Sequence, residues 1–169
     1  MAVMTRTVAV DSTDAGSFEA FFEDHYETLL KAVYLVTGNR SEAEDLAQEA
    51  FVKVYERWDR VRGTENPAGY LYRTAINAHH SRLRRLAVAA RKPWSRREPD
   101  PLEASEDRDE IRRALASLSD GQREAIVLVE WLDMTDAEAG EILGVSPVTV
   151  RVRITRARQA LAKQVRIDD

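Results

Sequence analysis

The stretch GVSPVTVRVRITRARQAL, residues 144–161, fits two different secondary structures. Between residues 148 and 155 its apolar residues alternate with polar ones, which is the period of a half-buried strand. The same letters also place apolar side chains at the spacing of one helical stripe, namely Val150, Ile154, Ala157 and Leu161. The choice decides the fold, because a strand here would need a partner strand.

The residues at the start of the stretch favour the helix. Gly144 is of the type that most easily takes the left-handed conformation after a helix, here the helix predicted over residues 136–143. Ser146 then suits the N-cap of a new helix, and Pro147 suits its first position. The sequence contains no second strand that pairs with this segment. A short helix, a turn with glycine and a second helix together predict a helix-turn-helix.

The second helix of this motif is predicted to carry an exposed basic arc. With Val150 and Ile154 facing inward, the outward side chains are those of Thr149, Arg151, Val152, Thr155, Arg156 and Arg158. Arginines bind phosphates or guanine edges, and short apolar groups contact thymine methyls, so the arc suits the major groove of DNA. A merely solvated basic face is the alternative, and the coincidence of turn, caps and arginines weighs against it.

The composition is that of a helical globular protein: of 169 residues, 44% are hydrophobic and 32% are charged. No apolar run reaches the roughly 18 residues of a membrane span, and the N-terminus lacks an apolar secretory core. We therefore expect a cytoplasmic protein without membrane insertion. The absence of cysteine excludes disulfides, thiolate nucleophiles and cysteine metal sites.

The net charge of −4 conceals four blocks of alternating sign. Residues 1–56 carry −7, residues 57–98 carry +8, residues 99–144 carry −9 and residues 145–169 carry +4. Two basic blocks, each preceded by an acidic one, indicate two modules with similar charge layouts. Chance clustering in a charged helical protein explains the same pattern when the pattern is taken alone.

The apolar periodicity predicts an all-α chain with two small helical bundles joined by a flexible linker. We expect a disordered tail over residues 1–16, a first bundle over 17–90, a linker over 91–107 and a second bundle over 108–166. The linker segment contains three prolines and many charges, which leave little to bury.

Capping signals predict where the individual helices begin. An apolar stripe from Phe18 to Val33 is expected to end near Gly38, and another begins at Ile111 after the linker. The predicted start signals are the capping boxes Ser41–Glu44, Ser119–Gln122 and Thr135–Glu138 and the Asn66-Pro67 pair.

The helix predicted from Pro67 to about Ala90 carries the other basic block. Its outward side holds Arg73, Asn77, His80 and Arg84, widened by Arg82 and Arg85, with Tyr70 and Tyr72 beside them. Arginines interleaved with tyrosines suit single-stranded or opened nucleic acid; core tyrosines with solvated arginines are the alternative. Adjacent His79 and His80 point about 100° apart on a helix and no third ligand is in view, so we expect no metal site and no cofactor.

An acidic face is predicted on the helix before it. Asp45, Gln48, Glu49 and Val52 recur at helical spacing, opposite the apolar stripe that contains Leu46. Most acidic helix faces are simply solvated, so the pattern alone leaves both a solvated face and a binding face open.

Three segments together resemble bacterial extracytoplasmic-function sigma factors of the sigma-70 family. The segments are EAEDLAQEAFVKVYERW (42–58), NPAGYLYRTAINAHHSRLRR (66–85) and LSDGQREAIVLVEWLDMTDAEAGEILGVSPVTVRVRITRARQAL (118–161). The likeness extends over residues 17–165, in the order and spacing of the family and with a linker where the family has one. Each segment alone is moderately specific, and the three together are strongly so.

The resemblance implies a promoter-specificity subunit of RNA polymerase and not an enzyme. In the family, the segment matching Asp45-Leu46-Ala47-Gln48-Glu49 docks on the coiled coil of the polymerase β′ subunit, and Val52 continues that face here. The segment matching Tyr70 to Arg85 reads and opens the −10 element. The segment matching Pro147 to Arg158, which adds Val148 and Arg153 to the arc, reads the −35 element as duplex DNA.

The partners implied by the resemblance are core RNA polymerase, through its β′ and β subunits, promoter DNA and an anti-sigma factor. Several positions depart from the usual residues of the family: Tyr70, His80, Ser81, Ala139, Gly140, Val148, Val152 and Thr155. These departures bear on which promoter is read more than on the function. A stand-alone helix-turn-helix transcriptional regulator is the alternative; it explains residues 109–166 but leaves the first module without a purpose.

Overall fold

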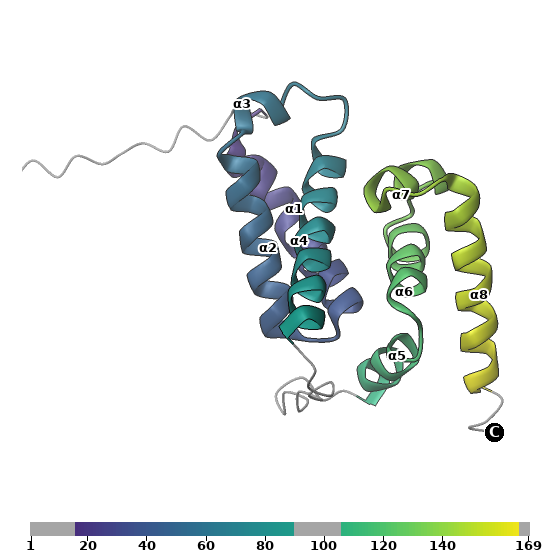
Figure 1. The fold of residues 1–169 in the computed structure, drawn as a ribbon. Coiled ribbons are helices and arrows are strands. Elements are labelled where there is room, and N and C mark those ends of the chain that lie inside the picture. Colours follow the sequence, from purple (N-terminus) through teal and green to yellow (C-terminus); the bar gives the residue numbers. More distant parts are fainter. Residues whose placement is uncertain (1–15, 90–105, 166–169) are drawn as a thin grey trace, which may run out of the picture.

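The computed structural model describes residues 16–89 and 106–165, and these residues form helices and turns without a strand (Figure 1). In chain order the helices are α1 (Phe18–Thr37), α2 (Arg40–Tyr55), α3 (Trp58–Val61), α4 (Pro67–Ala89), α5 (Glu106–Ala116), α6 (Asp120–Ile126), the π-helical segment η2 (Val127–Trp131), α7 (Asp136–Leu143) and α8 (Pro147–Val165). The all-α prediction is confirmed, and residues 147–161 are helical.

The predicted tail and linker lie almost wholly outside the described residues. Of the tail over residues 1–16 the structure describes Gly16, and of the linker over residues 91–107 it describes the helical residues from Glu106 onward. The second module therefore begins with α5, two residues before the predicted boundary at residue 108.

Helices α1, α2 and α4 form the first module, with α2 packed against both of the others (Figure 1). Apolar side chains of all three helices are buried between them, including Leu29, Val33, Leu46, Ala50, Val54, Leu71 and Ala75. Helix α2 ends at Tyr55, where the chain turns into the short helix α3, which the sequence did not predict. The core of this module thus holds α2 and α4 in fixed relative positions.

Two glycines end helices where the sequence predicts them to. Gly38 follows α1 with a φ of 67° and Gly144 follows α7 with a φ of 66°, the left-handed conformation that glycine adopts without steric cost. The capping boxes at Ser119 and Thr135 also form as predicted, with both reciprocal hydrogen bonds present.

The capping box predicted at Ser41 is wrong. Asn39 caps α2 instead, and its side-chain oxygen accepts a hydrogen bond from the Glu42 backbone N–H at 2.9 Å. Only Gly38 and Asn39 separate α1 from α2, so the new helix has already begun at Arg40. Ser41 is left inside the first turn, where its side chain is not at the cap position.

Helices α5 to α8 form the second module, in which α8 packs against α6 and α7. The predicted inner stripe of α8 is confirmed for three of its four residues: Val150 and Ala157 are fully buried and Ile154 is 6% exposed, whereas Leu161 is partly exposed. The stripe predicted from Ile111 is wrong at its first residue, because Ile111 is 54% exposed on α5. Between α6 and α7 the helix continues as the π-helical segment η2, which the periodicity did not predict.

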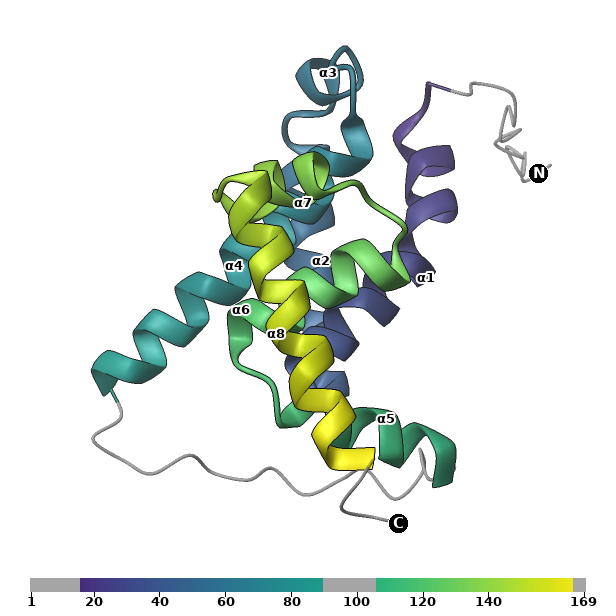
Figure 2. The ribbon, with the colours of Figure 1, turned by 90° about the vertical axis from the view of Figure 1, so that its right-hand side faces the viewer.

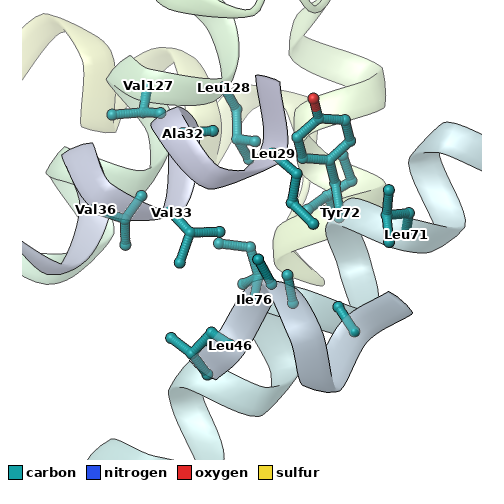
Figure 3. Packing of buried hydrophobic residues seen from close by; sticks show 14 of the residues in the cluster. Leu29, Ala32, Val33, Val36, Leu46, Leu71, Tyr72, Ile76, Val127 and Leu128 are labelled. Atoms are coloured by element: carbon teal, nitrogen blue, oxygen red, sulfur yellow. The ribbon is translucent and has the colours of Figure 1, made fainter. Parts of the chain in front are cut away.

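The two modules pack against each other, and their buried residues form one continuous cluster. Val127 and Leu128 of η2 lie beside Leu29 and Ala32 of α1, as Figure 3 shows. Helix α8 lies on the outer side of the second module, facing away from the first (Figures 1 and 2). The arrangement therefore leaves α8 open on its outer face and brings α4 close to the second module.

Candidate nucleic-acid interface and docking face

Helix α2 presents the predicted acidic face to solvent. Asp45, Gln48 and Val52 are exposed, and Glu49 is partly exposed; we call these four residues the α2 surface. Glu49 accepts a hydrogen bond from Lys53 at 2.7 Å, which lowers the pKa of its carboxyl and keeps it ionised near neutral pH. Asp45 lies 3.8 Å from the guanidinium of Arg82 on α4. The surface combines two carboxylates with an exposed valine.

Leu46 does not belong to this surface. Its side chain is fully buried in the core of the first module. Because Leu46 follows Asp45 by one residue, it points about 100° away around the helix axis, toward α1 and α4. The prediction that Leu46 contacts a partner is therefore wrong. Leu46 packs in the core beneath the α2 surface.

Helix α4 carries the second predicted nucleic-acid face. Its predicted residues, which we call the α4 surface, are Tyr70, Arg73, Asn77, His80, Arg82, Arg84 and Arg85. Arg73, Asn77, Arg84 and Arg85 are exposed, whereas Tyr70, His80 and Arg82 are partly buried. The arginines therefore follow the helix to its C-terminal end.

Two neighbours on α4 are buried. Tyr72, predicted to offer a stacking face beside Tyr70, is only 5% exposed, and burial raises the pKa of its hydroxyl to about 12. That part of the prediction is wrong, because the side chain faces the α1 side of the core. His79 is 4% exposed, and its Nδ1 lies 3.4 Å from a carboxylate oxygen of Glu42. Neither side chain is accessible to DNA.

The second module covers part of the α4 surface. Nε2 of His80 lies 2.7 Å from the carboxylate of Glu124, a glutamate on α6 that is only 2% exposed. Further along, Tyr70 and Arg73 line one wall of a crevice of about 370 Å³. The opposite wall contains three acidic residues of the second module, Asp133, Glu138 and Glu141. Basic and aromatic groups of α4 thus face carboxylates of the same chain.

Arg123 joins the modules at a second point. Its guanidinium donates to the backbone carbonyls of Leu115 at 2.9 Å and Leu118 at 2.8 Å within the second module. It also donates to the carbonyl of Val36 on α1 at 3.0 Å. Buried carbonyl oxygens that accept such charged donors are well satisfied, so Arg123 stabilises the contact between the modules.

The helix-turn-helix of α7 and α8 is held tightly at its turn. A Cβ atom on Gly140 would lie 2.7 Å from the carbonyl oxygen of Val145, so only glycine allows this close approach. Ser146 caps α8 by accepting a hydrogen bond from the Thr149 N–H at 3.2 Å, and Pro147 occupies the first helical position. These contacts fix the position of α8 relative to α7.

The outer face of α8 is exposed as predicted. It forms a shallow hollow of about 360 Å³, which we call the α8 surface and which is lined by Val148, Arg151, Val152, Thr155, Arg156 and Gln159. Pro147 and Arg158 are also exposed, while Thr149 and Arg153 are partly buried. The structure thus brings five of the nine predicted residues of α8 together in one open hollow.

Arg153 points away from the α8 surface. Its guanidinium packs over Gly121 of α6, where a Cβ atom would lie 3.1 Å from Cζ of the arginine. On the exposed side, Nε of Arg151 donates to the Asp136 carboxylate at 3.1 Å, and Arg158 donates to the carboxylate of Glu130. Asp136, Glu130 and the buried Glu124 were not predicted, because nothing in their own sequence context marks them as partners of distant basic residues.

The described residues give no support to other classes of site. Within residues 16–89 and 106–165, no cluster of three or more histidine, aspartate or glutamate side chains is arranged to hold a metal ion. None of the helices described is both long enough and apolar enough to cross a membrane.

Two helical modules, the second of which exposes a helix-turn-helix, form an architecture typical of DNA-binding transcription proteins. Residues 21–88 match the family described as Sigma-70 region 2, and residues 108–161 match Sigma-70, region 4. The ECF RNA polymerase sigma factor SigW of Bacillus subtilis is 29% identical to the chain, over 98% of each sequence. The chain belongs to the extracytoplasmic-function sigma factors of the sigma-70 family.

Solved structures show the same arrangement of helices. The sigma factor RpoE from Bartonella quintana, crystallised with the anti-sigma factor NepR, superposes with a TM-score of 0.76 and 23% identity over 90% of this chain and 98% of that one. CnrH, in complex with the cytosolic domain of CnrY, superposes with a TM-score of 0.66 and 25% identity over 90% and 89% of the two chains. The predicted fold class is therefore confirmed beyond the helix content alone.

Proposed function

We propose that the chain is a promoter-specificity subunit that docks on core RNA polymerase through the α2 surface and contacts promoter DNA through the α4 and α8 surfaces. In this assignment α4 reads the −10 element and α8 reads the −35 element. The protein acts in the cytoplasm, where its polymerase is, and carries no catalytic activity of its own.

The observation that carries the proposal is the presence in one chain of three separate surfaces of the required kinds. The α2 surface is acidic with an exposed apolar residue, which suits a protein partner with basic side chains. The α4 surface combines arginines with a tyrosine, which suits unstacked bases. The α8 surface is a basic helix face at an open helix-turn-helix, which suits a major groove.

A stand-alone helix-turn-helix regulator has use for only one of these surfaces. Family membership and the acidic α2 surface both favour the polymerase subunit. One of the two similar structures was solved with the anti-sigma factor NepR and the other with the cytosolic domain of CnrY, which supports an anti-sigma factor as a further partner of this chain.

The docking assignment is tested by reversing the charge of the α2 surface. The double variant Asp45→Arg/Glu49→Arg stays folded, because both positions lie off the apolar stripe, and it loses affinity for core polymerase. Removing one partner of a charged pair at an interface costs about 2–5 kcal/mol, so competition with the parent chain for core enzyme falls at least about 30-fold.

A matched control carries the same number of reversals elsewhere on the first module. Glu19→Arg/Glu23→Arg changes two carboxylates of α1 that lie outside the α2 surface, and it competes as the parent does. Equal competition by the Asp45→Arg/Glu49→Arg variant would refute docking through α2.

A further inference from the structure

The arginines of α8 differ in how their side chains are held. Arg151 is tied through Nε to Asp136, and Arg158 is tied to Glu130. Arg156 forms no hydrogen bond or ion pair with any residue that the structure describes. Arg151 and Arg156 share the α8 surface, so two arginines of one DNA-facing hollow are presented in different ways: one braced and one free.

The brace on Arg151 is built on rigid parts of the module. Asp136 is the first residue of α7, directly after the N-cap Thr135, whose capping box with Glu138 fixes the start of that helix. The close approach at Gly140 then fixes α7 against α8. The Asp136 side chain is 28% exposed, whereas that of Arg151 is 68% exposed. A partly buried carboxylate on a capped helix thus holds an exposed guanidinium on the neighbouring helix.

The geometry of the contact leaves the reading end of Arg151 available. Asp136 accepts from Nε, at 3.1 Å, and a guanidinium has four further N–H donors on its two terminal nitrogens. Those terminal donors are the ones that bind O6 and N7 of guanine, or a phosphate, in a two-pronged contact. The brace fixes the side chain without consuming the donors that DNA would take.

We propose that Asp136 is a positioning residue for base selection: it holds Arg151 in the orientation in which Arg151 reads one base of the −35 element. The inference rests on the proposed function, in which α8 is the −35-reading helix. An unbraced arginine samples many rotamers and must be ordered when it binds, whereas a braced one is already ordered. Asp136 therefore contributes to sequence selectivity without contacting a base.

The proposal predicts an unusual combination of effects for Asp136→Ala. Preference at one −35 position falls about two- to five-fold, the range that an exposed ion pair supports. The summed output over all −35 sequences stays at or above the parent level, because the substitution removes a negative charge from the side of the module that meets phosphates. A loss of folding would lower the output on every sequence instead.

The experiment is transcription by holoenzyme, reconstituted from the full chain and bacterial core RNA polymerase, on templates with a randomised −35 region. The variants are Asp136→Ala, Arg151→Ala and the double variant, each with a melting temperature. Asp120→Ala is the matched control, because Asp120 is the first residue of α6, directly after the N-cap Ser119, and its carboxylate accepts a hydrogen bond from Arg123 of α6 and not from an arginine of α8. Glu130→Ala removes the brace of Arg158, which lies further along α8.

The inference expects Asp136→Ala and Arg151→Ala to relax the same base position, and the double variant to be no more relaxed than Arg151→Ala. It expects Asp120→Ala and Glu130→Ala to keep the parental preference. If Arg151→Ala relaxes a position while Asp136→Ala does not, or if Asp120→Ala relaxes the same position, the positioning role is refuted and the proposed function stands. If no sequence preference is transcribed at all, the proposed function fails first.

Discussion

The two helices proposed to contact DNA, α4 and α8, differ in what lies over them. The α8 surface is an open hollow. Helix α8 itself lies on the outer side of the second module (Figure 2). The α4 surface faces inward over part of its length, with His80 against the buried Glu124 and with Tyr70 and Arg73 across a crevice from acidic side chains. Both helices bury an apolar stripe in their own module, so the difference comes from how the modules pack together.

With the two modules packed together, the three surfaces differ in how far the second module covers them. The α2 surface lies on the first module where no described element of the second covers it, and the α8 surface is open. Nucleic acid reaches Tyr70, Arg73 and His80 together only when the second module moves away. Under the proposed function, docking on polymerase and reading of the −35 duplex therefore need no separation of the modules, whereas reading of the −10 element does.

The largest expected effect comes from preventing that separation. Thr64 and Glu141 line opposite walls of the crevice and are both exposed. The chain has no cysteine, so Thr64→Cys/Glu141→Cys is bridged selectively by a cleavable bismaleimide. The bridged protein is expected to bind core polymerase and to give run-off transcription at background level, because the α4 surface stays covered.

The same sample supplies its own control, since cleavage of the bridge should restore transcription. Each single cysteine variant treated with the reagent should transcribe as before. Full activity of the bridged protein would show that α4 does not need to be uncovered. It would contradict the claim that α4 and α8 differ in their access to DNA.

A smaller effect is expected from loosening the turn under α8. In Gly140→Ala the new methyl group meets the backbone oxygen of Val145, which no change of rotamer relieves. Such overpacking costs about 3 kcal/mol, and it should weaken −35 recognition while the α2 surface still binds core polymerase. Urea unfolding followed by circular dichroism, with competition for core enzyme on the same preparation, checks both parts. Unchanged stability would contradict the close approach.

The smallest effects separate base reading from simple attraction along α8. Arg156→Ala is expected to cost about 1–3 kcal/mol on the preferred promoter and to relax one −35 position, as loss of a guanine contact does. Lys163→Ala, near the end of the helix, should weaken all promoters alike and reduce the salt slope by about one unit. Transcription from the randomised −35 templates at two salt concentrations measures both, and an Arg156→Ala variant with the parental preference would show that Arg156 is a charged anchor and does not read a base.

Local signals explain what the sequence predicted well. Gly144, Ser146 and Pro147 are sufficient to choose helix over strand for residues 147–161, because helix ends are set by backbone conformation and capping within a few residues. The same logic located the boxes at Ser119 and Thr135. This reasoning failed at Ser41. Asn39 lies nearer to the end of the preceding helix, and Asn39 is the residue that caps α2.

Contacts between segments that are distant in the chain explain the features that the sequence did not predict. Residues 80 and 124 are both charged or polar, and nothing in either neighbourhood indicates that they meet at 2.7 Å. His80 was therefore predicted only as a DNA contact, and Glu124 was not singled out. The assignments of Leu46 and Tyr72 to binding surfaces followed family position or composition, whereas the packing of α1, α2 and α4 places both in the core.

The central claim is that one chain reads two separate promoter elements with two helices while it is bound to polymerase. The most direct test is transcription by reconstituted holoenzyme from templates randomised at both the −10 and the −35 regions, using the parent chain, Arg73→Ala/Asn77→Ala on α4 and Arg151→Ala on α8. The account predicts two blocks of sequence preference, with the α4 variant altering only the −10 block and the α8 variant altering only the −35 block. A single block that the α4 variant leaves unchanged, or preferences that ignore both variants, would contradict it.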